Sequence, residues 1–212
     1  MEKLLVFDLD GTLIDSRLDL AAAVNTVRAE QGLDMLTVEQ VKSFIGNGIR
    51  KLVERSFADA TVDLPVILER YRTIYYSQSA VHTSIYPGVK AGLEQLQEAG
   101  MVSTVLTNKP GGISRSILET LGLLPFFKTV IGAEDGYDLK PSSEGIHALM
   151  KAHTVDTDSC WMIGDHHTDL VAGMNADVRT GFVSYGFGHT DNLKPTKHFA
   201  SFSEVVEYFL HS

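Results

Sequence analysis

The chain has 212 residues, and its 18 Lys and Arg against 27 Asp and Glu give a formal net charge of -9. Hydrophobic residues make up 44% of the chain, and the length suits one large domain or a domain with an insertion. The acidic balance argues against sequence-independent nucleic-acid binding, which depends on clustered Lys and Arg. No apolar stretch approaches the roughly 18 residues of a membrane span. No signal peptide is recognised, and Cys160 has no partner for an internal disulfide. We therefore expect a cytoplasmic protein that is not bound to a membrane.

The first predicted element in chain order is a buried strand at residues 4–7, a short apolar run that leads into an acidic loop. From about residue 16 to residue 82 the apolar spacing is helical, and no segment has a convincing strand pattern. The helical signals are Leu18, Ala22 and Val27, a capping-box pattern at residues 37–40, an apolar stripe at Ile49, Leu52, Val53 and Phe57, and residues 64–76. We expect residues 16–82 to form an all-helical insertion.

Beyond residue 83, predicted strands and helices alternate along the chain. The predicted strands are residues 102–106, 128–131, 160–163 and 181–183. The predicted helices are residues 88–99, 114–121, 142–152 and 203–210. This alternation predicts an α/β fold, a doubly wound parallel sheet with a Rossmann-like core. The α/β core would comprise residues 1–15 and 83–212, and the inserted all-helical cap domain residues 16–82.

Acidic side chains follow the ends of two predicted strands. Asp8 and Asp10 come after the first strand, and Asp165 follows the strand at 160–163, with Asp169 one helical turn further on. Taken singly, each could be a turn residue or an acid favoured in a first helical turn. Because the carboxyl ends of parallel strands meet at one edge, we expect all four to converge. Carboxylates packed this closely need a cation, and an all-oxygen ligand set favours Mg2+.

Groups able to bind a phosphate are predicted at the same edge of the sheet. Thr107 and Asn108 follow the strand at 102–106, and Lys140 is the nearest cation that can offset a phosphate's charge. Backbone N–H groups around Gly11 can bind further phosphate oxygens. The predicted substrate-binding residues of the core are Gly11, Thr12 and Asn108.

These motifs resemble those of a known superfamily. DLDGT at residues 8–12, Thr107, Lys140 with Pro141, and GDxxxD at residues 164–169 are similar to the four motifs of the haloacid dehalogenase superfamily, in the same order. The helical insertion resembles that superfamily's cap of the first type. Residues 45–48, 107–110 and 185–188 resemble the phosphoglycolate phosphatase group within it.

The resemblance implies a Mg2+-dependent phosphomonoester hydrolase that acts on a small phosphorylated metabolite. Asp8 would be the nucleophile that forms an aspartyl-phosphate, and Asp10 would be the general acid and then the general base. Thr107 and Lys140 would hold the phosphoryl oxygens. The implied metal ligands are Asp8, Asp10 through its backbone carbonyl, Asp165 and Asp169. An acid at position 10 favours phosphate transfer over carbon–halogen cleavage.

The cap is expected to select the substrate. Gly46 and Gly48 allow a close backbone approach, so a loop that includes Asn47 would close over the core site. Arg50 would then meet a second anionic group, which suits 2-phosphoglycolate. A helix-to-helix turn with solvated basic residues explains the same sequence equally well.

Three other features have simpler interpretations. Tyr71, Tyr75 and Tyr76 are expected to belong to the core of the cap, and residues 186–188 to a loop near the edge of the sheet. His166 and His167 are compatible with a transition metal, but adjacent residues rarely ligate one ion together, and one of them is expected at the mouth of the site.

Alternative functions remain open at this point. A β-phosphoglucomutase-like phosphomutase or a pyrophosphatase of the same superfamily would use the same core motifs. A phospho-accepting receiver-like module also places acids, Thr and Lys around Mg2+, although such modules are shorter and have no cap. The sequence leaves both a monomer and a homodimer possible.

Overall fold

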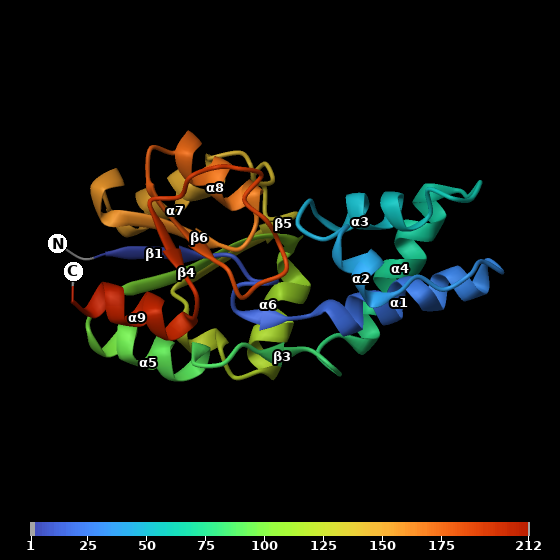
Figure 1. Ribbon diagram of the computed structural model, residues 1–212, viewed down its shortest axis with the longest axis horizontal. Helices are drawn as coiled ribbons and strands as arrows, with labels where there is room; N and C mark the ends of the chain where they lie inside the picture. Colours follow the sequence, from blue (N-terminus) through green and yellow to red (C-terminus); the bar gives the residue numbers. More distant parts are fainter. Residues whose placement is uncertain (1–2, 212) are drawn as a thin grey trace.

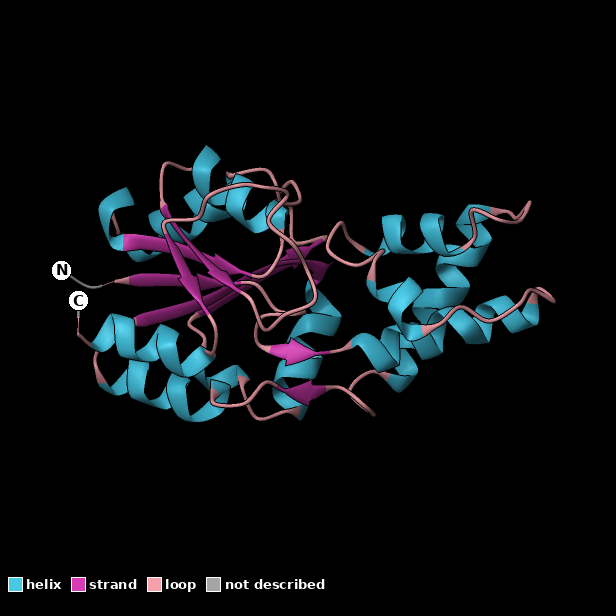
Figure 2. Cartoon of the chain, in the orientation of Figure 1, coloured by secondary structure: helices cyan, strands magenta, loops and turns pink. Residues whose placement is uncertain are grey.

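A six-stranded parallel sheet forms the centre of the larger part of the molecule (Figure 2). The protein is described by a computed structural model that covers residues 3–211. In sheet order the strands are β5 (Thr129–Ala133), β4 (Val102–Pro110), β1 (Leu4–Phe7), β6 (Cys160–Gly164), β7 (Arg179–Val183) and β8 (Lys197–Phe199). The chain runs outward from β1 to β5, returns to the other side of β1, and runs outward again to β8. Its direction along the sheet therefore reverses beside β1, where ligands of such folds bind.

Helices cover both faces of this sheet, which confirms the predicted doubly wound α/β fold (Figure 1). One face carries α5 (Val89–Glu98), α6 (Gly111–Thr120) and α9 (Phe202–Leu210), and the other carries α7 (Glu144–His153) and α8 (His167–Asn175). Alternate residues of β1 face opposite layers: Leu5 and Phe7 pack on the first, Leu4 and Val6 on the second. Because both faces of the sheet are buried, the strand sequences are continuous apolar runs and do not alternate between apolar and polar residues.

Two strands of the six-stranded sheet differ markedly from the sequence-based expectation. Strand β4 extends to Pro110 and is irregular between Leu106 and Pro110, so Thr107 and Asn108 lie within the strand rather than after it. Strand β8 was not predicted, because Lys197 and His198 are exposed and leave only Phe199 buried.

The smaller part of the molecule consists of four helices at one end of the core (Figure 1). They are α1 (Arg17–Glu30), α2 (Val38–Lys42), α3 (Ile49–Ser56) and α4 (Leu64–Gln78). The capping box that opens α2 is present, with Thr37 and Gln40 bonded reciprocally. The predicted helix α1 is present, but of the three residues that indicated it only Val27 is buried, together with Leu20 and Val24, whereas Leu18 and Ala22 are exposed. None of the helices within residues 3–211 has the length and apolar character to cross a bilayer.

The two connections between the helical part and the core lie side by side. Strands β2 (Ile14–Asp15) and β3 (Ser84–Ile85) pair antiparallel across them. Asp19 in α1 accepts hydrogen bonds from the backbone N–H groups of His82 and Thr83 and from the Thr83 hydroxyl. Two-residue strands carry too short a pattern to be read from sequence. The domain boundaries at residues 16 and 82 stay a prediction.

We predict that the single thiol is inert in the folded protein. Cys160 begins β6 and is completely buried, and this burial raises its pKa to about 12. At pH 8 a thiol-reactive dye should label the native protein very slowly, because the thiol is protonated and inaccessible. In denaturant one thiol per chain should react at once. Rapid labelling of the native protein would contradict the packing of β6 described above.

Candidate active site

Three carboxylates meet where β1 and β6 end, at the point where the strand order reverses. Asp8 directly follows β1, Asp165 follows β6, and Asp169 lies in the first turn of α8. One oxygen of each lies within 4.8 Å of an oxygen of both others, and all three side chains are buried. Asp169 is completely buried, which excludes its interpretation as an exposed first-turn acid.

Lys140 is the cation that faces this cluster. Its Nζ lies 2.8 Å from Asp8 Oδ1 and 2.7 Å from Asp169 Oδ1, and it donates to the Leu106 carbonyl at 2.7 Å. Burial alone would lower the pKa of Lys140, but the Asp169 and Asp8 charges outweigh that effect and raise it. The lysine is therefore charged when it faces the two acids.

One ammonium group does not balance three buried carboxylates. Even with Lys140 beside it, burial raises the pKa of Asp8 to about 6. Burial, followed by the charges of Asp8 and Asp169, raises the pKa of Asp165 well above its usual range. A divalent cation would relieve both effects, and carboxylate oxygens are the ligands that Mg2+ prefers. The donor set therefore fits Mg2+.

Asp165 is held in place by a loop from far along the chain. Its Oδ2 accepts hydrogen bonds from the backbone N–H groups of Phe187 and Gly188 at 3.0 and 2.8 Å, and Thr12 Oγ1 donates to its Oδ1 at 3.3 Å. Residues 186–188 were expected to form a loop near the edge of the sheet. The structure adds that this loop lies against the acidic cluster, where it binds Asp165. Because backbone N–H groups donate these hydrogen bonds, they require no particular side chains. The only signal of this loop's role in the sequence was the pair Gly186 and Gly188.

Glycines allow this close packing around Asp165. A Cβ at Gly11, whose φ is +86°, would lie 2.1 Å from Asp165 Oδ2. A Cβ at Gly186 would lie 2.4 Å from Asp165 Cβ. Gly11 and Thr12, predicted to bind substrate, thus support Asp165 in this structure and do not line the pocket described below.

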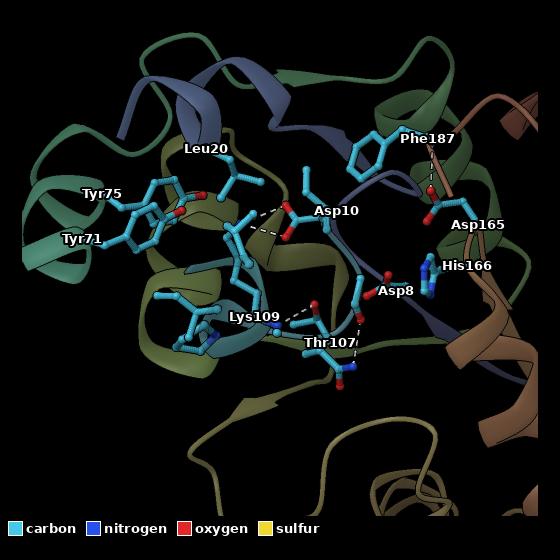
Figure 3. Close-up of a pocket in the computed structure, with 17 residues that line it drawn as sticks. Asp8, Asp10, Leu20, Tyr71, Tyr75, Thr107, Lys109, Asp165, His166 and Phe187 are labelled. Carbon is cyan, nitrogen blue, oxygen red and sulfur yellow. Dashed lines mark hydrogen bonds and ion pairs between the residues drawn. The ribbon is translucent and has the colours of Figure 1, made fainter. Parts of the chain in front are cut away.

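Asp10 points away from Asp8 and Asp165 and toward a different lysine, Lys109 (Figure 3). Its two oxygens lie 2.9 and 2.8 Å from Lys109 Nζ, and Ser16 Oγ donates to it at 2.5 Å. Lys109 Nζ also lies 4.9 Å from the centre of the Tyr75 ring. We did not predict this role for Lys109, because the contact joins residues that are 99 positions apart.

Asn108 joins the core to the cap. Its side-chain oxygen accepts from the Lys140 N–H at 2.8 Å, and its NH2 group donates to the Lys140 carbonyl at 2.9 Å and to the Gly46 carbonyl at 3.0 Å. The amide is therefore already occupied by backbone groups, although Asn108 was predicted to bind substrate. Thr107 is buried beside it and faces the pocket.

A pocket lies between the core and the helical part, with charged groups on the core side and mostly apolar groups on the other (Figure 3). The polar and charged side chains are Asp8, Asp10, Thr107, Asn108, Lys109, Asp165 and His166. The apolar and aromatic side chains are Leu20, Ile45, Ile49, Leu52, Tyr71, Tyr75, Pro110 and Phe187. One of the two adjacent histidines was expected at the mouth of the site, and His166 lies there.

The cap residues divide into those that reach the pocket and those that do not. Gly46 and Gly48 line it, and a Cβ at Gly46 would lie 2.7 Å from His166 Nε2, so the expected close approach is present. Asn47 does not line it. Arg50 is 75% exposed and ion-paired with Glu54, outside the pocket.

Two of the three cap tyrosines lie at the pocket. Tyr71 and Tyr75 are buried and stacked, as expected of cap core, yet both also line the pocket. Their hydroxyl groups have no hydrogen-bond partner among residues 3–211. Tyr76 is 38% exposed and lies outside it.

Comparisons with known proteins show which family the chain belongs to. Residues 5–183 match the family described as haloacid dehalogenase-like hydrolase. A phosphoglycolate phosphatase of Caulobacter vibrioides is 36% identical over 188 residues, which are 86% of this chain and 79% of that protein. A phosphoglycolate phosphatase of Vibrio parahaemolyticus is 33% identical over 216 residues, 97% of this chain and 95% of that protein. The crystal structure of a predicted phosphoglycolate phosphatase from Haemophilus somnus has a TM-score of 0.92 at 26% identity and covers 98% of both chains.

The family match spans all the strand-end motifs from Asp8 to Asp169. It confirms the resemblance inferred from those motifs. The chain is an enzyme of the haloacid dehalogenase-like hydrolase family, similar to the phosphatases of that family.

Proposed function

We propose that the protein is a Mg2+-dependent phosphomonoester hydrolase that works through an aspartyl-phosphate on Asp8. The observation that carries this proposal is the position of Asp8. Its carboxylate contacts the Lys140 ammonium group, belongs to the cluster of acids suited to Mg2+, and lines a pocket formed by both core and cap residues. Asp10, two residues further on, faces the same pocket.

The reaction has two steps in this proposal. In the first, an Asp8 oxygen attacks phosphorus, the ester P–O bond breaks, and Asp10 gives a proton to the leaving oxygen. In the second, Asp10 takes a proton from water, the water oxygen attacks phosphorus, and the bond to Asp8 breaks with release of phosphate. Because Asp10 must carry a proton at the first step, its ion pair with Lys109 has to loosen when substrate binds.

The remaining core residues stabilise charge. Mg2+, held by Asp8, Asp165, Asp169 and the Asp10 backbone carbonyl, would offset the negative charge of carboxylate and phosphate together. Lys140 and Thr107 would bind the phosphoryl oxygens. Asn108 would act by fixing the Lys140 backbone, which its amide already holds from both sides.

For the substrate, 2-phosphoglycolate is the first candidate, because the relatives in Caulobacter vibrioides and Vibrio parahaemolyticus are named phosphoglycolate phosphatases. The pocket itself favours a second candidate, a phosphomonoester with an apolar leaving group. Its cap side is formed by Leu20, Ile49, Leu52 and two tyrosines, which offer hydrocarbon and aromatic surface rather than cations.

Replacing the nucleophile tests the reaction class. Asp8→Asn keeps the size of the side chain but removes its charge, so kcat should fall by about 1000-fold or more. Phosphate release is measured from 2-phosphoglycolate, phenyl phosphate, β-glucose 1-phosphate and pyrophosphate, with Mg2+ or with a chelator. Wild-type release should require Mg2+. Release from none of these compounds by folded, Mg2+-bound wild type would favour a phosphomutase or a phospho-accepting module.

The role of Arg50 can be tested separately. Because its side chain is exposed and paired with Glu54, Arg50→Gln should leave kcat/KM for 2-phosphoglycolate within about twofold of wild type, as for a surface residue. Steady-state kinetics with 2-phosphoglycolate and phenyl phosphate would measure this. A KM that rises tenfold for 2-phosphoglycolate alone would show instead that Arg50 reaches the substrate when the cap closes.

The support of Asp165 by the 186–188 loop can be tested with a matched pair of glycine variants. Gly186→Ala places a methyl group against Asp165 and the Gly11 carbonyl, so it should weaken Mg2+ binding about 10- to 100-fold. Gly112→Ala is the control, because a Cβ there meets nothing within 4 Å. Mg2+ affinity is read from calorimetry and from the Mg2+ dependence of activity. Equal affinities in the two variants would contradict the role given to this loop.

A further inference from the structure

Three histidines converge at the rim of the pocket, separate from the acidic cluster. His166 and His167 stand at the start of α8, and His189 comes from the connection between β7 and β8. A ring nitrogen of each lies within 4.8 Å of a ring nitrogen of both others. The ring centres are 4.1, 5.2 and 5.4 Å apart in pairs.

A neighbouring oxygen lies beside the Nδ1 atom of each imidazole ring. Asp191 Oδ1 lies 2.8 Å from His189 Nδ1, and Asp191 Oδ2 lies 3.2 Å from His167 Nδ1. His166 Nδ1 lies 3.0 Å from Thr168 Oγ1. When the Nδ1 atoms of His167 and His189 carry the proton that faces Asp191, their Nε2 atoms keep a lone pair for a metal. His166 Nδ1 also accepts from the Thr168 backbone N–H at 3.3 Å, so binding through His166 Nε2 requires its proton to move to Nδ1, where Thr168 Oγ1 can accept it. An oxygen partner on the far nitrogen of the ring is the usual arrangement around histidine ligands of metal ions.

We propose that His166, His167 and His189 bind a divalent transition metal of the Zn2+ type. Imidazole nitrogen suits Zn2+ or Ni2+, whereas the oxygen ligands of the acidic cluster suit Mg2+, so the two sites differ in chemistry. Three protein ligands leave one coordination position open. The sequence-based objection, that adjacent histidines rarely ligate together, is answered by the third ring and by the Asp191 carboxylate that lies beside two of the three.

The three nitrogens already lie close enough that binding one ion requires at most a small contraction. Zn–N bonds of about 2.0–2.1 Å place ligand nitrogens closer together than the 4.8 Å limit that now encloses them. The His189 side chain is 63% exposed and has room to move inward, whereas His166 is buried. Because His166 also lines the pocket, the bound ion would lie at the pocket's rim and add positive charge there.

The test is a binding measurement on full-length protein without a polyhistidine tag. Zn2+ is titrated by calorimetry in saturating Mg2+, and Co2+ is added in a parallel experiment because its visible absorption reports nitrogen ligands. Wild type should bind one Zn2+ per chain. His189→Gln should abolish this binding, and Asp191→Asn should weaken it about 10- to 100-fold.

Two further variants make the outcome decisive. His147→Gln changes an exposed histidine on α7 and should bind Zn2+ as wild type does. Asp165→Asn should keep the Zn2+ site. Absence of Zn2+ binding, or Zn2+ binding that survives His189→Gln and is lost in Asp165→Asn, would overturn the proposal. None of these measurements depends on phosphatase activity, so they test the metal site independently of the proposed function.

Discussion

The burial of three carboxylates against one lysine is the constraint on which the rest of the site depends. Two carboxylates about 4 Å apart repel by roughly 4 kcal/mol at an effective dielectric of 20. Asp8, Asp165 and Asp169 are nevertheless held together by contacts that fix each of them: Lys140 for Asp8 and Asp169, and backbone N–H groups for Asp165 and Asp169. The fold therefore keeps a site of high negative charge that a cation can complete.

Holding the acids requires both the sheet and small residues. The central position of β1, with β4 and β6 on either side, brings strand ends from three distant parts of the chain to one place. A Cβ at Gly164 would lie 2.1 Å from Asp169 Oδ2, and one at Gly11 would lie 2.1 Å from Asp165 Oδ2. Larger side chains at these positions would separate the carboxylates. The glycines of the motifs are therefore needed to let the acids lie close together as well as to form the turns of the chain.

The sequence predicts what local pattern determines and misses what distant contacts determine. Buried strands that end in acids are visible as apolar runs, so Asp8 and Asp165 could be placed at one sheet edge. The exposed side of α1 was misassigned because its buried side is set by α4, which makes Leu20 and Val24 internal and Leu18 external. The pairing of Lys109 with Asp10 and the backbone donors of Phe187 and Gly188 also depend on tertiary approach, which single-sequence spacing does not encode.

Asn108 connects the chemistry of the core to the position of the cap. The same amide group donates to the Gly46 carbonyl of the cap loop and to the Lys140 carbonyl of the core. A movement of the cap loop therefore changes the partners of the residue that fixes the Lys140 backbone. The apolar surface that the cap presents excludes water, and charge interactions strengthen when water leaves. In the proposed mechanism, cap closure would thus both hold the Lys140 backbone and increase the effect of Lys140 on a phosphoryl group at Asp8, so the Asn108 amide would link cap movement to catalysis.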